Sequence, residues 1–220
     1  MPGANPAQEA STSNNYSVMK DLAAMLFKVD SPRKAPVAGG LLIAEPFLRE
    51  SYFSHGVITV IDYAPRDGAT GVVMNTSSGY NLDDLLDGVK VTEKIPVFCG
   101  GPLEQDRLFF IHTLGDDILP GARRFCDNLY IGGDFGAMRD YLAAGYPTAG
   151  CVRFFIGYSC WGEGQLEEEI NRATWVSLPQ ITDTTALLTG GGDTYWHKAV
   201  RRLGDSHRSW NLLPLDPQCN

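Results

Sequence analysis

The chain has 220 residues, of which 44% are hydrophobic, and it carries a formal net charge of -8 at pH 7. A chain of this length and apolar content can bury a large core by itself, so we expect one domain that needs no metal or disulfide to fold. The acidic balance disfavours general binding to nucleic acid or anionic lipid, because the average field of the protein repels both.

Cysteine and histidine spacing argues against a metal centre. The five cysteines form an odd set without a C-x-x-C pair, and the four histidines lie near no cysteine pattern typical of zinc. We therefore expect reduced thiols, no metal and no cofactor. The first 15 residues lack the basic and apolar regions of a signal peptide, and no stretch is apolar for the roughly 18 residues that cross a bilayer. These features predict a cytoplasmic protein.

Composition divides the chain into three parts. Residues 1–15 are small and polar, which predicts a disordered N-terminal arm. Within 16–36, apolar residues recur at three- and four-residue spacing between Val18 and Val29, which predicts a short amphipathic helix followed by a linker. Residues 37–220 are predicted to form the main domain.

In the main domain, short apolar runs rich in β-branched and aromatic residues alternate with glycine-rich turns, a pattern typical of strands. In chain order, strands are predicted within 39–47, 56–63, 71–74, 97–101, 107–113, 128–133 and 151–158. Capping residues and helical spacing predict helices within 82–86, 134–145, 164–175 and 193–204, the last with Asp193 as its cap. Paired glycines such as Gly100–Gly101 match no phosphate-binding motif and indicate positive φ angles or close backbone approach.

Two motifs could carry nucleophilic chemistry, and neither is complete. In GYSCW, Trp161 replaces the second glycine of a nucleophile elbow and is too bulky for that turn, so Ser159 is interpreted as a turn residue. Cys160 lies just before a predicted helix N-terminus, where the helix dipole stabilises a thiolate, and His112 is its candidate base. A lone cysteine is more often an inert small apolar residue.

Five motifs in order carry a family resemblance: LLIAEPFL, GATGVVMN, PVFCGGPLEQDRLFFIH, LYIGGDFGAMRDYLAAG and VRFFIGYSCWGEGQLEEEI. Over roughly residues 37 to 180 the chain resembles the bacterial AlgH/YqgE family. The resemblance implies an α+β fold, a single compact domain of coiled, bifurcated mixed β-sheets flanked by short helices. It also implies a cytosolic protein, and members are labelled transcriptional regulators through a link to alginate synthesis. Thr76 and Ser77 depart from the family's usual Arg-Pro, and Cys160 replaces a small residue.

The leading functional hypothesis is a non-enzymatic regulatory or binding protein that acts through a protein or small-molecule partner, with a homo-oligomer left open. We expect GGPLEQDR and GYSCWGEGQ to converge, because both lie at the ends of predicted strands, where sites usually form. The alternative is a small hydrolase or transferase that uses Cys160 or a carboxylate such as Glu168 in a glycine-rich cleft. The predicted pocket or partner surface consists of Asp106, Arg107, Asp134, Tyr158, Trp161, Gln165 and Glu168.

The charge balance yields a test of direct DNA binding. The most basic predicted helix is 193–203, and its few cations do not offset the net charge of -8. We expect no mobility shift when micromolar protein is mixed with random duplex DNA at about 50 mM salt, where phosphate-contacting proteins bind well. A salt-sensitive shift that disappears when Lys198, Arg201 and Arg202 are replaced by Ala would make direct DNA binding the leading hypothesis.

Overall fold

The computed structural model describes Val29 and residues 33–86, 88–89, 91, 93–179 and 182–213. The arm predicted at 1–15 lies outside these residues. So does the amphipathic helix predicted between Val18 and Val29, apart from Val29 itself. The account below concerns the described part of the chain, which covers most of the predicted main domain.

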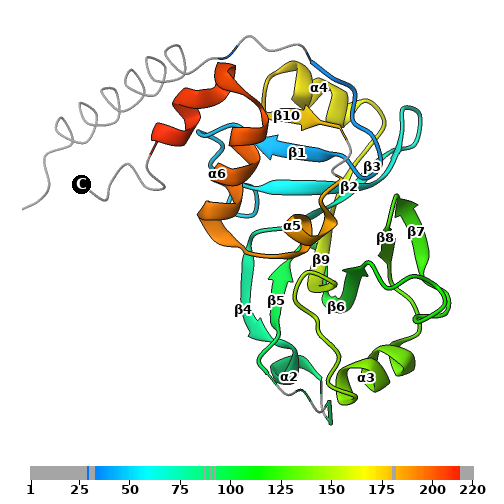
Figure 1. Ribbon diagram of the computed structural model, residues 1–220. Coiled ribbons are helices and arrows are strands. Elements are labelled where there is room, and N and C mark those ends of the chain that lie inside the picture. Colours follow the sequence, from blue (N-terminus) through cyan, green and yellow to red (C-terminus); the bar gives the residue numbers. More distant parts are fainter. Residues whose placement is uncertain are drawn as a thin grey trace, which may run out of the picture.

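The upper half of the molecule in Figure 1 is an antiparallel sheet built around the most apolar runs of the sequence. Neighbouring strands of this sheet all pair antiparallel, and the three in the middle are also consecutive along the chain. In spatial order they are β10 (Trp175–Leu178), β1 (Leu41–Ala44), β2 (Val57–Ala64), β3 (Gly68–Val73) and β9 (Val152–Trp161).

The lower half is a second set of strands that shares β9 with the first, so the sheet branches at this strand. The first half of β9 has an antiparallel neighbour on one side and a parallel neighbour, β5, on the other. The remaining strands extend outward from these two neighbours. They are β5 (Pro96–Cys99) paired with β4 (Ser77–Asn81), and β6 (Leu103–His112) followed by β8 (Leu129–Ile131) and β7 (Arg123–Cys126).

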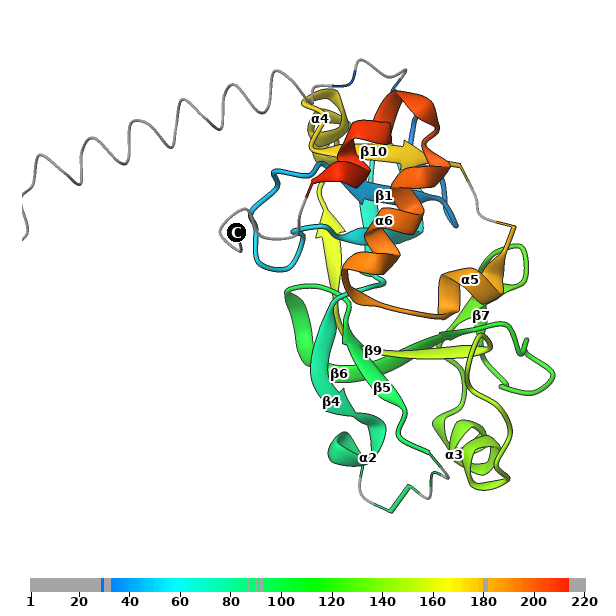
Figure 2. The same cartoon turned by 60° about the vertical axis from the view of Figure 1, so that its left-hand side comes forward.

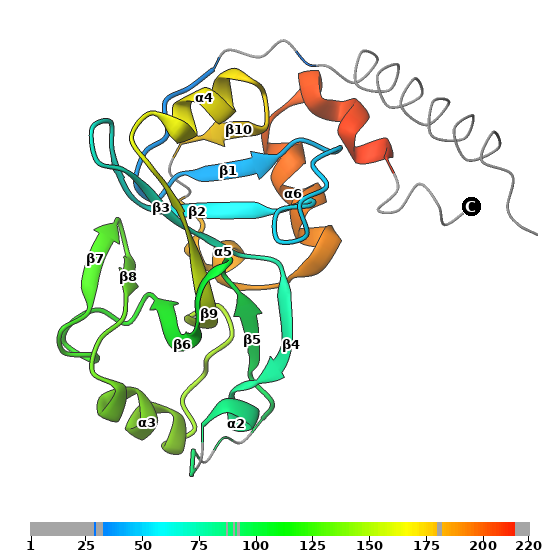
Figure 3. The ribbon, with the colours of Figure 1, turned by 180° about the vertical axis from the view of Figure 1, so that it is seen from behind.

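Short helices cover both halves. Figures 1 and 3 show α4 and α6 against the upper strands, α2 and α3 at the lower end, and α5 between the halves. None of the helices in the described residues is both long and apolar enough to cross a membrane. The bounds are α2 (Leu82–Leu85), α3 (Phe135–Ala143), α4 (Gln165–Asn171), α5 (Thr184–Leu188), α6 (Gly192–Arg202) and the 3-10 helix η1 (Asp205–Leu212). This single domain of mostly antiparallel strands and short helices confirms the predicted α+β class.

Helix α6 confirms the predicted apolar stripe and corrects its predicted cap. Trp196 and Val200, which were assigned to one side of the helix, are both fully buried, because residues four apart lie on the same face. The N-cap is Gly191 rather than Asp193, which lies within the first turn. The carboxylate of Asp193 is therefore free to contact other elements.

Other elements differ from the sequence prediction in extent. The helix predicted within 164–175 ends at Asn171, because Ala173 adopts a positive φ of 61° and Trp175 already begins β10. The edge strands β4, β7 and β10 were not predicted. They are short, and two of them are polar, so they lack the long apolar alternation that marks a strand in a sequence.

The branch in the sheet depends on the close approach of two glycine-containing segments. Gly157, in the middle of β9, has φ = 70°, and a Cβ atom there would lie only 2.4 Å from the Gly101 oxygen and 2.9 Å from the Leu103 oxygen. A Cβ at Gly100 would lie 2.2 Å from the Gly157 oxygen. The predicted meaning of the Gly100–Gly101 pair, close backbone approach, is thus confirmed.

Replacing Gly157 by Ala should therefore destabilise the fold by more than its φ angle alone requires. We expect Gly157→Ala to lower the free energy of unfolding by about 2–4 kcal/mol, because the positive φ and the backbone overlap both oppose the side chain. The matched control is Gly164→Ala, with φ = 71° and no atom within 4 Å of the added Cβ. In this control the free energy of unfolding should fall by only about 1 kcal/mol. Urea unfolding measures both, and equal losses would contradict the close-approach account.

Candidate functional site

Arg153 is the one charged residue of strand β9, which is mostly apolar, and it is only 4% exposed. Its Nη1 donates a hydrogen bond to the carbonyl oxygen of Met74, just after β3, and its Nη2 donates to the carbonyl oxygen of Gly190, just after α5. The guanidinium carbon lies 4.2 Å from the centre of the Phe98 ring. Arg153 therefore joins β9 to the end of β3 and to the connection between α5 and α6.

The Arg153 guanidinium is a buried cation without an anionic partner in the described part of the chain. No ion pair among the described residues includes it. Burial lowers the pKa of Arg153 to about 10, and the nearby Tyr195 opposes this shift only in part. The side chain is still positively charged at neutral pH. Charge buried in this way is unfavourable unless an opposite charge or strong hydrogen bonds compensate for it.

A cleft of about 380 Å³ opens beside Arg153. Its walls come from the start of β5, the turn before β9, and the end of α5 with the residues that follow. The lining is largely apolar around the guanidinium, with the exposed Lys94 and Glu93 among the remaining residues. The residues that line it are Glu93, Lys94, Ile95, Pro96, Phe98, Thr148, Ala149, Val152, Arg153, Leu188, Thr189, Gly190 and Gly191. Figure 2 shows α5 lying between α6 and the lower strands at this position.

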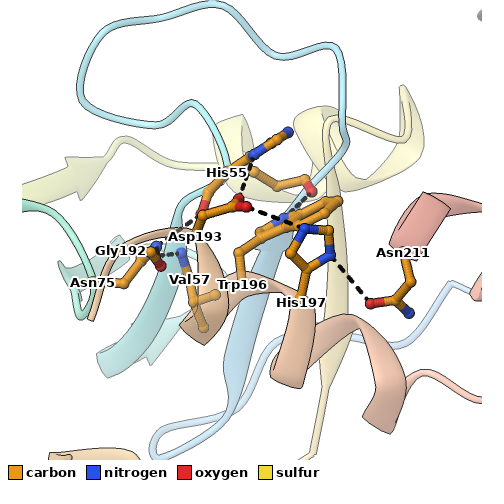
Figure 4. A network of polar contacts seen from close by, with 9 residues as sticks. His55, Val57, Asn75, Gly192, Asp193, Trp196, His197 and Asn211 are labelled. Atoms are coloured by element: carbon orange, nitrogen blue, oxygen red, sulfur yellow. Dashed lines mark hydrogen bonds and ion pairs between the residues drawn. The ribbon is translucent and has the colours of Figure 1, made fainter. Parts of the chain in front are cut away.

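The connection between α5 and α6 forms one wall of the cleft. Hydrogen bonds to Asn75 hold its end at Gly192 in place. The Asn75 side chain donates to the carbonyl oxygens of His55 at 2.9 Å and Gly192 at 3.0 Å, and it accepts from the Val57 N–H at 2.8 Å. The Gly192 N–H in turn donates to the Asn75 carbonyl oxygen at 2.8 Å. Figure 4 shows these contacts around the start of α6. Asn75 thus links β2, the end of β3 and α6.

On the other side of the same helix turn, Asp193 bridges two histidines (Figure 4). Its Oδ1 lies 2.9 Å from His55 Nδ1, and its Oδ2 lies 3.1 Å from His197 Nε2. The His55 ring stacks on Trp196 with 4.2 Å between ring centres, and His197 Nδ1 lies 3.2 Å from the Asn211 side-chain oxygen. Because a carboxylate only accepts hydrogen bonds, both imidazoles must donate to it. The network fixes the start of α6 against the loop before β2.

The structure brings three of the sequence-predicted site residues near one another. Leu103 lies opposite Tyr158 in the β6–β9 pairing, so GGPLEQDR and GYSCWGEGQ are neighbours in the sheet. Glu104 connects the two segments, with an ion pair to Arg107 at 2.9 Å and a contact of 3.5 Å with the Tyr158 hydroxyl. Asp106 and Arg107 are both exposed.

The other predicted residues lie in two further places. Trp161 and Gln165 gather around Glu169, whose carboxylate accepts from Trp161 Nε1 at 2.8 Å and from Gln165 Nε2 at 3.0 Å. Glu168 is exposed and forms an ion pair with Arg172. Asp134 caps α3 by accepting from the Ala137 N–H at 2.7 Å. None of the seven predicted residues lines the cleft beside Arg153, so their role as a partner surface stays a prediction.

Sequence reasoning missed the residues that build the cleft and its support. Arg153 had a visible signal, because a lone charge inside a strongly apolar strand must be compensated within the fold. No sequence signal linked His55, Asn75 and Asp193 to one another, since they become neighbours only when β2, β3 and α6 pack together. Among the described residues, no group of three His, Cys, Asp or Glu side chains could hold a metal ion.

The structure separates the two residues considered for thiol catalysis. Cys160 lies opposite Thr70 near the end of β9, whereas His112 lies opposite Val152 at its start. Eight residues of strand span about 26 Å. His112 is already engaged, because Nε2 donates to the Gly132 oxygen at 2.9 Å and Nδ1 accepts from the Leu114 N–H at 3.2 Å. His112 is therefore not the base for Cys160.

Comparison with known proteins defines the class to which this fold belongs. The family model described as AlgH-like matches residues 41–208. A UPF0301 protein of Parabacteroides distasonis is 39% identical over 195 residues, covering 89% of this chain and 97% of the relative. A UPF0301 protein of Bacteroides thetaiotaomicron is 34% identical over the same shares. The chain belongs to the AlgH-like family.

Two solved structures have a similar fold. The solution structure of the AlgH protein from Pseudomonas aeruginosa has a TM-score of 0.63 at 25% identity and covers 80% of this chain and 94% of that chain. The crystal structure of protein DIP2367 from Corynebacterium diphtheriae has a TM-score of 0.66 at 20% identity, with 83% and 93% covered. The family expected from the sequence motifs is thus confirmed.

The Asp193 bridge generates a stability prediction. In Asp193→Asn, the amide can accept from only one of the two imidazole N–H groups, so we expect the free energy of unfolding to fall by about 1–3 kcal/mol. The control is Asp140→Asn on the exposed face of α3, which should change stability by less than about 0.5 kcal/mol. Urea unfolding provides the comparison. A loss in Asp193→Asn no larger than in the control would show that the bridge contributes little.

Proposed function

We propose that this protein is a non-enzymatic regulatory or binding protein that takes a small-molecule ligand in the cleft beside Arg153. The observation that carries the proposal is a buried, positively charged side chain at the wall of a largely apolar cleft of about 380 Å³. Small-molecule sites are typically apolar concavities of this size with a few convergent polar groups.

The rigidity of the cleft supports binding. Arg153 is held by two backbone carbonyl groups, and the Gly190–Gly192 segment is held by Arg153 and Asn75. Tyr195 adds a further tie, because its hydroxyl donates to the Leu187 oxygen at 2.7 Å. A preformed site binds more tightly, because less side-chain and loop entropy is lost when the ligand enters.

The hydrolase or transferase alternative depends on groups that lie elsewhere. Cys160 and Glu168 are both exposed, and neither lines the cleft. Glu168 forms an ion pair with Arg172 on the surface of α4. A binding role for the cleft requires no reactive group, which is why it is the function we favour.

Blocking the cleft tests the proposal. Ala149 is exposed and lines the cleft, so Ala149→Trp should fill part of it. We expect a ligand-detected NMR screen of small metabolites, both neutral and charged, to find compounds that bind the full chain. Their affinity should fall at least tenfold in Ala149→Trp, because the indole occupies ligand volume.

The matched control is Ala144→Trp, at an exposed position that does not line the cleft. It should retain the wild-type affinities. A screen without any compound that loses affinity in Ala149→Trp relative to this control would refute a ligand site beside Arg153.

A further inference from the structure

Arg153 differs from the arginines that form ion pairs in this structure, because it is buried and they are exposed. Four exposed arginines have a carboxylate partner within 4 Å, whereas the buried Arg153 has none among the described residues. In folded proteins buried charges are the ones that are normally paired, because desolvation makes an isolated charge unfavourable. The four paired arginines are Arg107, Arg123, Arg124 and Arg172. The missing carboxylate at Arg153 is therefore one that a ligand can supply.

The hydrogen bonds of Arg153 leave donors for such a ligand. A guanidinium has five N–H groups, and the two bonds to Met74 and Gly190 engage one on each terminal nitrogen. Three N–H groups, including the one on Nε, have no partner among the described residues. Two parallel N–H groups form the fork that matches the two oxygens of a carboxylate.

We propose that the ligand of this cleft is a small organic carboxylate whose carboxylate group pairs with the Arg153 guanidinium. This inference rests on the function proposed above. The apolar wall of Ile95, Phe98 and Leu188 receives the hydrocarbon or aromatic body of the ligand. The anion thus compensates the buried charge, and the body displaces water from the apolar wall.

The local charges favour a monoanion over a phosphate dianion. Arg153 is a single positive charge, and the exposed Lys94 in the cleft lining is next to the exposed Glu93, which offsets it. The cleft also borders the N-terminus of α6, where the N-cap Gly191 offers no side-chain acceptor to the first N–H groups. The Asp193 carboxylate in the first turn offsets the partial positive charge of that helix end, so Arg153 remains the main positive charge beside the cleft.

Paired probes separate the charge from the shape of the ligand. The full chain is titrated with three carboxylates, namely hexanoate, benzoate and phenylacetate. The primary amide of each acid is its neutral counterpart. Inorganic phosphate and phenyl phosphate test a more highly charged anion. We expect at least one carboxylate to bind at least tenfold more tightly than its amide, and more tightly than either phosphate. The ¹H–¹⁵N resonance of Arg153 Nε, assigned by its loss in Arg153→Lys, should shift on binding.

Two variants complete the test. Arg153→Lys retains the charge but loses the fork, so carboxylate affinity should fall at least tenfold. Because this variant could also disturb the fold, the same titration of Ala149→Trp and its control Ala144→Trp provides an independent loss of binding with Arg153 in place.

The outcomes distinguish this inference from the proposed function. Amides that bind as tightly as their acids, or screening hits in the cleft that are all neutral, would overturn the carboxylate inference and leave a small-molecule site standing. Phosphates that bind more tightly than every carboxylate would overturn it as well. If no acid shifts the Arg153 Nε resonance at about 10 mM, a concentration that half-saturates a site with a Kd of about 10 mM, the inference also fails.

Discussion

The structure depends on the two hydrogen bonds that the buried Arg153 guanidinium donates to backbone carbonyl groups. One holds the end of β3 at Met74, and the other holds the connection between α5 and α6 at Gly190. Both carbonyl groups belong to segments that leave regular secondary structure, where no ladder partner satisfies them, and a charged donor provides the strongest available substitute. The upper strands, the lower strands and α6 therefore meet at one side chain of β9.

The branched sheet explains why this arrangement is possible. Because β9 has β5 and β6 as neighbours along its first half and β3 near its end, the two sets of strands diverge around Gly157, and Arg153 lies in the half of β9 that pairs with the lower strands. Helix α5 lies between the two halves (Figure 2), and its last residue and the segment up to Gly191 form one wall of the cleft. Asn75 and Asp193 hold the start of α6, which follows this wall of the cleft.

The distribution of charge gives this cleft its chemical character. The chain as a whole is acidic, with a net charge of -8, so its average field repels polyanions. A single buried cation inside such a protein acts only at short range, where low-polarity surroundings strengthen its field. A small anion that enters the cleft meets this local field, whereas a long phosphate backbone meets mainly the acidic surface. The charge distribution therefore fits the proposed carboxylate ligand better than it fits a nucleic acid.

The sequence by itself determined most of the central strands and α3 and α6, because their apolar spacing records which face of each element is buried. It also carried the ordered motifs of the AlgH-like family. Only the tertiary structure decided the site. Local periodicity indicates that a residue is buried but not which partner it meets. Arg153, Asn75 and the start of α6 with Asp193 come together only when β9, the end of β3 and α6 pack against one another. Short polar edge strands such as β4 escaped prediction for the same reason, since pairing with β5 rather than their own sequence makes them strands.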